Sequence, residues 1–141
     1  MKQIFTFLLI VSFSSAYSQF SVGMHIGTSN KNKVVGLHSQ YQFSNRFTVG
    51  LNMTTHTDNS NPAFFQSRFG YTLGNSEGLS VQPYIGYSYG IQNFEKNNYG
   101  GQFTKGAQLR YQLTRIALVY TDINIPAPHY YLFSVGIAGR F

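Results

Sequence analysis

The sequence has no cysteine and no tryptophan, and only 10% of its residues are charged. Without cysteine the chain can form no disulfide and carries no site for a thiol-linked lipid anchor. Ordinary soluble domains have about 25% charged residues. A soluble β-barrel needs charged groups on its hydrated exterior, so this scarcity of charge favours a barrel whose exterior faces lipid.

Long apolar runs are also scarce. The longest, Ile4 to Phe13, follows Lys2 and precedes the small residues of 14–18. A transmembrane helix needs about 20 apolar residues, so this run is too short. A positive residue, an apolar run and small residues, in that order, are typical of a secretory signal peptide. We expect residues 1–18 to be cleaved and residues 19–141 to form the mature domain, whose membrane crossings must be made by strands.

Aromatic residues and glycine are abundant, with 11 Tyr, 13 Phe and 14 Gly. The mature sequence divides into alternating apolar and small or polar segments, separated by turn residues. These segments are 20–29, 33–43, 47–57, 64–73, 79–92, 102–113, 116–125 and 130–141. A tilted membrane strand takes about 9–11 residues, so eight strands use the whole mature length. The predicted fold is all-β, an eight-stranded antiparallel up-and-down transmembrane β-barrel with a lumen filled by side chains.

Two residues test the register of these strands. Pro83 cannot donate to a ladder, so a bulge or a position at the barrel rim is expected there. A two-residue turn at Thr114-Arg115 would point Asp122 toward lipid, where a carboxylate is costly. We therefore expect an odd-length turn or a bulge that brings Asp122 inside, where it could pair with Arg68 or Arg110.

Several arginines are expected inside the barrel. Arg68, Arg110 and Arg140 fall on inward positions, whereas the mature chain has few carboxylates. Buried charges must be paired or hydrated. The favoured interpretation is a lumen network of Arg68, Arg110 and Asp122 with neighbouring polar side chains, and the alternative is an interior that attracts anions.

Two histidines share the polar face of adjacent segments. A turn at Lys31-Asn32 would place His25 directly opposite His38 in the lumen. Imidazoles at that spacing could bind a metal or respond to pH. No cysteine or carboxylate nearby completes a coordination sphere, so packing in the lumen is favoured and neither a metal nor a cofactor is expected.

A second group of candidate residues enters the loop after residue 57. His56, Asp58 and Ser60 lie at alternate positions, and His129 lies in a later loop. These are residue types that hydrolases use. A polar loop rich in Asn, Asp and Ser is more often structural, because these side chains bond to their own backbone.

The last strand alternates Tyr131, Phe133, Val135, Ile137 and Gly139 with small or polar residues and ends in Phe141. With the leader and the strand count, this ending resembles the small eight-stranded outer-membrane proteins of the OmpA/OmpX-like superfamily, in compact form without a periplasmic domain. The resemblance implies that the barrel-assembly machinery recognises Phe141. It also implies an outer-membrane location, with both mature termini in the periplasm.

The remaining expectations concern partners and role. The formal net charge is +6, but the basic residues are scattered, so nucleic acid is not an expected partner and contact with lipid and lipopolysaccharide is. Aromatic residues near strand ends, Tyr130 among them, should form girdles at the bilayer surfaces. The leading hypothesis is a non-enzymatic structural barrel, an accessory subunit of a larger outer-membrane complex. The alternatives are a lipid A-modifying enzyme and an OmpX-like surface adhesion or resistance protein.

Overall fold

The computed structural model describes residues 19–30, 32–43, 46–57, 63–75, 78–91, 101–127 and 129–141. The predicted signal peptide, residues 1–18, lies outside these ranges. Within them, no helix is long and apolar enough to cross a membrane.

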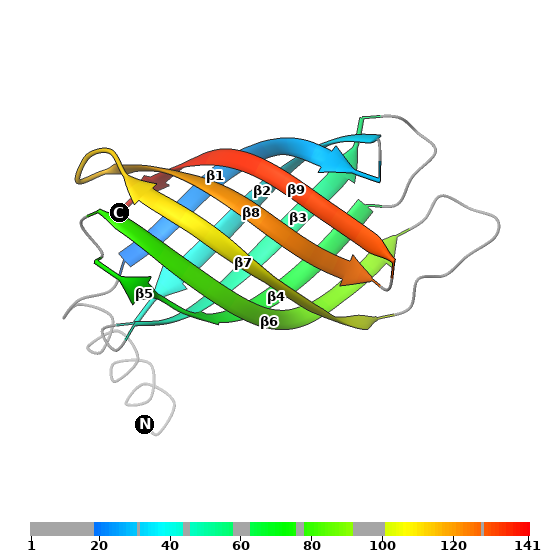
Figure 1. Cartoon of the computed structure of the whole chain (residues 1–141), viewed down its shortest axis with the longest axis horizontal. Coiled ribbons are helices and arrows are strands. Elements are labelled where there is room, and N and C mark those ends of the chain that lie inside the picture. Colours follow the sequence, from blue (N-terminus) through cyan, green and yellow to red (C-terminus); the bar gives the residue numbers. More distant parts are fainter. Residues whose placement is uncertain are drawn as a thin grey trace, which may run out of the picture.

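Nearly all of the described chain is β-strand (Figure 1), and the strand bounds lie within two residues of the predicted ones. The strands are β1 (Gln19–Ser29), β2 (Asn32–Gln42), β3 (Phe47–His56), β4 (Ala63–Tyr71), β5 (Leu73–Gly74), β6 (Leu79–Ile91), β7 (Gln102–Gln112), β8 (Ala117–Ala127) and β9 (Tyr130–Arg140).

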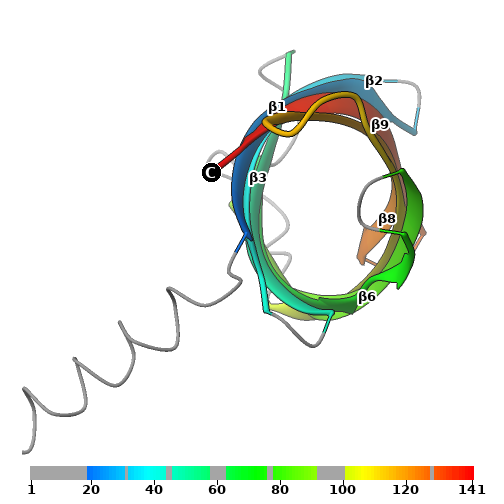
Figure 2. The same cartoon turned by 90° about the vertical axis from the view of Figure 1, so that its left-hand side faces the viewer.

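The strands close into a barrel, which Figure 2 shows end-on. Neighbours pair in the order β4-β3-β2-β1-β9-β8-β7-β6, and β4 also pairs with β6. All of these pairings are antiparallel. β5 pairs with β6 in the same register as β4 does, since Ala63 pairs with Ile91 and Leu73 with Val81. β4 and β5 are therefore parts of one barrel strand, and the predicted eight-stranded barrel is confirmed.

The short interruption between β4 and β5 lies opposite Pro83. The pairing of β4 with β6 ends at Tyr84 and resumes, through β5, at Val81. Pro83, which has no N–H to donate, faces this gap. On the other side Pro83 stays paired with Ala107 of β7, and the register does not shift. Of the two expected solutions, the bulge is wrong, because a local break in one ladder accommodates the proline; Pro83 lies in the first half of β6, on the side of the rim where the chain ends.

The strands are strongly staggered around the barrel. A row of paired residues that begins at Gln19 on β1 passes through Tyr84 on β6 and Asn124 on β8 and returns to β1 at Ser29, ten residues along. A stagger of this size in an eight-stranded barrel corresponds to a strand tilt of about 40°. Each row of paired residues therefore climbs from one rim toward the other, and the interior is just wide enough for side chains.

A three-residue turn separates β7 from β8. The N–H of Leu113 donates to the carbonyl of Ala117 at 3.0 Å, which leaves residues 114–116 as the turn. The expected odd-length turn is confirmed. Because side chains alternate along a strand, this turn length directs Asp122 into the lumen, where it is 4% exposed.

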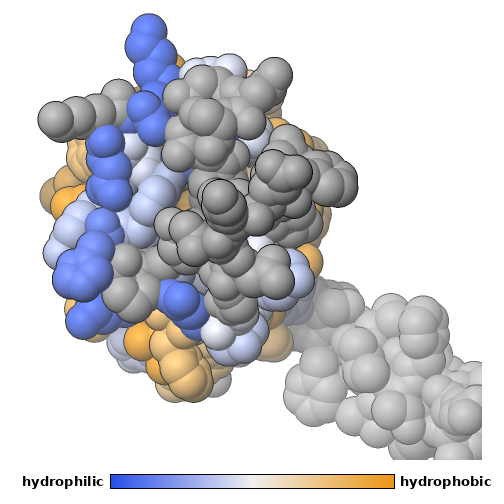
Figure 3. Space-filling view, turned by 90° about the vertical axis from the view of Figure 1, so that its right-hand side faces the viewer, coloured by the Kyte–Doolittle hydropathy of each residue, from blue (hydrophilic) through white to orange (hydrophobic). Residues whose placement is uncertain are grey.

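Side chains alternate between two different surroundings. The inward ones are mostly small or polar, whereas the outward ones are largely apolar and exposed; Ile26, Leu51 and Ile85 are 65–68% exposed. In Figure 3, which shows the rim away from the carboxyl terminus, hydrophilic residues lie at the rim and apolar residues at its outer edge. An apolar band outside and a polar interior are the pattern of a barrel in a bilayer.

The carboxyl end of the chain closes the barrel against its first strand. The N–H of Phe141 donates to the carbonyl of Phe20 at 2.8 Å, and the N–H of Phe20 donates back at 3.3 Å. The side chain of Phe141 is 81% exposed. The backbone of this residue thus completes the contact between β1 and β9, and its ring remains available to other molecules.

Deleting Phe141 is expected to lower the yield of folded barrel, because two closing hydrogen bonds worth about 1 kcal/mol each are lost. Folding can be followed on SDS gels, where an intact barrel migrates faster before boiling than after it. Phe141→Tyr is the control, since it keeps both backbone bonds and an aromatic ring. A deletion variant that folds as completely as the unaltered chain would contradict this prediction.

Candidate functional site

An ion pair lies in the middle of the lumen. Arg68 on β4 contacts Asp122 on β8, with 2.8 Å between Nη1 and Oδ2. Tyr84 on β6 donates its hydroxyl to the other carboxylate oxygen of Asp122 at 2.8 Å. The guanidinium carbon of Arg68 also lies 4.4 Å from the centre of the Tyr84 ring. Since β4 and β8 are not neighbours, the ion pair spans the lumen and links separate parts of the wall.

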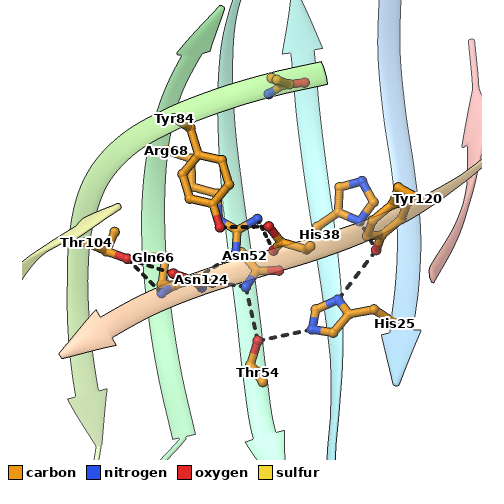
Figure 4. A network of polar contacts seen from close by, with 12 residues as sticks. His25, His38, Asn52, Thr54, Gln66, Arg68, Tyr84, Thr104, Tyr120 and Asn124 are labelled. Atoms are coloured by element: carbon orange, nitrogen blue, oxygen red, sulfur yellow. Dashed lines mark hydrogen bonds and ion pairs between the residues drawn. The ribbon is translucent and has the colours of Figure 1, made fainter. Parts of the chain in front are cut away.

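Neutral amides surround the other side of the guanidinium group (Figure 4). The Oε1 atom of Gln66 lies 2.9 Å from Nη2 of Arg68, 3.0 Å from the Asn52 amide and 2.7 Å from the Asn124 amide nitrogen. Thr104 donates its hydroxyl to Asn124 at 2.8 Å. Gln66 thus gives Nη2 of Arg68 a polar partner, and the other amides hold Gln66 in place.

The two histidines do not lie directly opposite each other. His25 pairs with Gly36, and His38 pairs with Gly23, because the turn between β1 and β2 lies one residue earlier than expected. The prediction of a direct pair is therefore wrong. The two imidazoles instead lie on a diagonal, and both still face the lumen.

Tyr120 on β8 joins the two histidines, as Figure 4 shows. Its hydroxyl lies 2.6 Å from Nδ1 of His38 and 3.5 Å from Nδ1 of His25. On the opposite edge of His25, Nε2 lies 3.1 Å from the hydroxyl of Thr54. Among the described residues, no group of three His, Cys, Asp or Glu side chains is placed to hold a metal ion.

Glycines make room for the bridging tyrosines. A Cβ atom at Gly136 would lie 2.4 Å from the ring of Tyr120, and one at Gly106 would lie 2.3 Å from the hydroxyl of Tyr84. Real Cβ contacts are never that short, so each aromatic side chain can cross the lumen only over a strand position that carries no side chain. The inward glycines are therefore part of the network.

A second polar layer lies nearer the termini. Arg110 donates to Oε1 of Gln82 at 2.8 Å, and Gln40 donates to the same oxygen at 2.9 Å. The amide nitrogen of Gln82 donates in turn to Thr48 at 2.8 Å. Arg110, the other partner expected for Asp122, thus has a different set of contacts. Arg140 also faces inward and donates to Gln112.

The middle of the lumen is closed by these layers. The space bordered by His25, Arg68 and Asp122 has no room for a water molecule. Between Arg110 and Arg140 there is a cavity of about 10 Å³, close to the minimum that one water molecule needs. The arrangement holds side chains in fixed positions and leaves no passage through this part of the barrel.

The residues expected to form a hydrolase-type group are only partly described. His56 is buried at the rim away from the termini, where Nε2 contacts the hydroxyl of Tyr130. The ring of Tyr130 also lies 5.0 Å from that of Phe64. Tyr130 therefore faces inward, and its predicted place in the outer aromatic girdle is wrong. Asp58 and Ser60 lie outside the described residues.

His129 lies in the turn between β8 and β9 and is exposed. Its φ angle is 63°, and its carbonyl accepts a hydrogen bond of 3.1 Å from the side chain of Asn30. His129 thus fastens the turn before β9 to the turn after β1. This contact gives the residue a structural part in the rim.

Sequence reasoning anticipated a polar lumen but missed some of its main members. Tyr120, Asn52 and Asn124 were not singled out, although each lies on the inward side of its strand by simple alternation. A search for large polar side chains at inward positions next to inward glycines would have found Tyr120. The amide positions follow only from the stagger of the strands, which alternation does not determine.

These features define the class of protein as a closed, eight-stranded antiparallel transmembrane barrel with a packed polar lumen. Solved structures confirm the class. The N-terminal β-barrel domain of Pseudomonas aeruginosa OprF matches with a TM-score of 0.72 and 15% identity, over 87% of this chain and 97% of that one. A de novo designed transmembrane β-barrel matches with a TM-score of 0.71 and 18% identity, over 87% and 95%.

The outer membrane protein Ail of Yersinia pestis, in phospholipid bilayer nanodiscs, matches with a TM-score of 0.56 and 14% identity, over 86% of this chain and 99% of Ail. No protein-family model matches the sequence, and no curated protein matches it either. At these identities the likeness concerns the fold. The chain has the fold of the small outer-membrane β-barrels and is similar to OprF and Ail in architecture.

Asp122→Asn is expected to destabilise the barrel by about 3–5 kcal/mol, because it leaves the buried guanidinium of Arg68 without its counter-charge. The hydrogen bond from Tyr84 can persist to the new amide oxygen. Urea unfolding of the barrel in lipid vesicles, followed by gel mobility, measures the change. The double variant Arg68→Gln/Asp122→Asn removes both charges and should recover part of the loss. Equal stability of Asp122→Asn and the unaltered chain would contradict the assigned role.

Proposed function

We propose that this chain is a non-enzymatic barrel that acts as an accessory subunit beside a larger outer-membrane protein. The observation that carries the proposal is the closed lumen. Arg68, Asp122 and their partners fill its middle, so a solute or a substrate has no room there. A barrel of this kind has to act through its outer surface or through its rims.

The three histidines that face the described lumen are hydrogen-bonded to its tyrosines. His25 and His38 both bond to Tyr120, and His56 bonds to Tyr130. A catalytic base must reach the proton that it abstracts from a substrate. His56, on which a lipid A-modifying enzyme would depend, points into the barrel and not toward the lipid. Within the described residues, no observation therefore favours an enzymatic alternative.

The middle of the outward face over β8 and β9 suits contact with another membrane protein. Thr121 and Val119 on β8 lie beside Val135 and Ile137 on β9. These side chains are β-branched, and none is aromatic. Small or compact side chains allow two membrane segments to approach closely. A neighbouring barrel could therefore pack against this face with few gaps.

The expected partner can be tested with single cysteine variants, because the chain has no cysteine of its own. Thr121→Cys on β8, carrying a thiol-linked photo-crosslinker, should give one discrete adduct with a larger protein in native outer membranes. Thr55→Cys is the matched control, since it faces outward from β3, four strands away around the barrel. Mass spectrometry identifies the adducts.

Adducts of equal yield and composition at positions 121 and 55, or none at either position, would contradict the accessory-subunit proposal. Both variants must first show the gel mobility of a folded barrel. That measurement separates a missing partner from a chain that has failed to assemble.

The proposed orientation places both mature termini in the periplasm. The segments that follow β3 and β6, residues 57–62 and 92–101, are longer than the connections at the rim where the chain ends. Outer-membrane barrels have short turns on the periplasmic side and longer loops outside the cell. The lengths of the connections therefore support an extracellular position for the rim that Figure 3 shows.

The orientation predicts that cysteines placed at two exposed threonine positions are labelled differently on intact cells. In Thr57→Cys the thiol should react on intact cells with a maleimide attached to a polymer too large for porins. In Thr114→Cys the thiol lies in the turn at the opposite rim and should react only after the outer membrane has been disrupted. Labelling of position 114 but not of position 57 on intact cells would reverse the orientation.

A further inference from the structure

The apolar exterior carries a lysine on β7, in addition to Lys33 near the start of β2. Lys105 on β7 points outward and is exposed. The residues directly paired with it are Ile85 on β6 and Ile125 on β8. Asp122 is the single acidic residue in the described part of the chain, and it faces the lumen. Within that part, the ammonium group of Lys105 therefore has no carboxylate on its own side of the wall.

Lys105 lies close to the rim away from the termini. β7 begins there at Gln102, three residues before Lys105. A lysine at this depth can extend its flexible stem along the apolar surface and bring its charge to the level of the lipid headgroups. The headgroups at that level include anionic phosphates, to which an ammonium group is complementary in charge.

An apolar groove of about 470 Å³ crosses the exterior of the barrel. It starts on β6, the strand next to β7. Its floor follows one row of paired residues, from Tyr87 on β6 through Ser67, Leu51 and Ser39 to Val22 on β1. The two serines are the small members of this row, and larger side chains such as Phe65 and Met53 border it. The groove thus arises where small outward residues interrupt a surface of large ones.

The stagger of the strands gives the groove a direction. Tyr87 lies in the half of β6 near the rim away from the termini, whereas Val22 lies near the start of β1 at the opposite rim. The groove therefore descends from the level of Lys105 through the apolar band toward the opposite rim. At its upper end, Tyr87 pairs with Phe103, the next outward residue to Lys105 on β7. Their rings make an edge contact, with 6.0 Å between the centroids.

We infer that this face binds lipid A, with a phosphate on Lys105 and one acyl chain in the groove. A positive charge at headgroup depth and an apolar channel leading inward match an amphiphile with an anionic head and a hydrocarbon tail. The choice of lipid A rests on the proposed orientation, which puts Lys105 in the outer leaflet. The site lies on β1 to β7 and adjoins, without including, the face over β8 and β9 that is proposed for the protein partner.

Native mass spectrometry of the full mature barrel in nanodiscs tests the inference. The probes are bis-phosphorylated lipid A, the same lipid A after enzymatic removal of its phosphates, and phosphatidylglycerol. We expect the barrel to bind bis-phosphorylated lipid A most tightly. Lys105→Met, which keeps the apolar stem, should weaken that binding about 10-fold, the usual scale for losing a hydrogen bond to a charged group. It should leave binding of dephosphorylated lipid A unchanged.

Three further variants separate the two parts of the site. Lys105→Arg should restore binding of bis-phosphorylated lipid A. Ser67→Phe fills the groove and should weaken binding of both forms of lipid A. Lys33→Met is the matched control, because Lys33 also points outward near the same rim but lies on β2, away from the upper end of the groove. Its effect should stay below about 2-fold.

Several results would overturn the inference. They are equal losses in Lys105→Met and Lys33→Met, tight binding of phosphatidylglycerol, unchanged binding in Ser67→Phe, or a photo-crosslink from Ser67→Cys that captures a protein and no lipid. Binding in nanodiscs needs neither the partner nor the cellular orientation. A failure here therefore differs from failure of the crosslink at position 121 or of the labelling at position 57.

Discussion

The structure depends on the pairing of β1 with β9, because a strand edge left open in hydrocarbon would expose unpaired N–H and C=O groups. Closing the sheet forces a fixed stagger between the strands, and the stagger decides which side chains meet across the lumen. Arg68 and Asp122 belong to strands that never pair, yet their charged groups lie 2.8 Å apart. The ion pair is thus a consequence of closure, and it also resists opening of the wall.

The lumen combines charge, amides and aromatic rings in one continuous arrangement. Arg68 shares its hydrogen bonds between Asp122 and Gln66, while Tyr120 joins both histidines. This packing leaves the interior without a free site in its middle. The properties that distinguish one part of the barrel from another therefore lie outside. The middle of the outward face over β8 and β9 carries β-branched side chains, and the face over β1 to β7 carries the groove and Lys105.

Much of the fold was predictable because side chains alternate with a period of two in every strand. The strand bounds, the barrel and the inward position of Asp122 all follow from that alternation and from the cost of a carboxylate in lipid. The pairing of His25 was not predictable. A shift of the pairing by two positions keeps every side chain on the same face, so alternation does not distinguish the two registers. Because alternation leaves the register open, it also could not identify Tyr120 as the residue that bridges the two histidines.

The three-residue turn before β8 has a consequence for how such a chain can vary. Adding or removing one residue in 114–116 would rotate all of β8 by half a turn and exchange its lumen and lipid faces. Adding two residues would lengthen the turn and leave both faces as they are. Unless a bulge compensates, insertions and deletions are tolerated here only in even numbers, so the permissible lengths of this connection obey a parity rule.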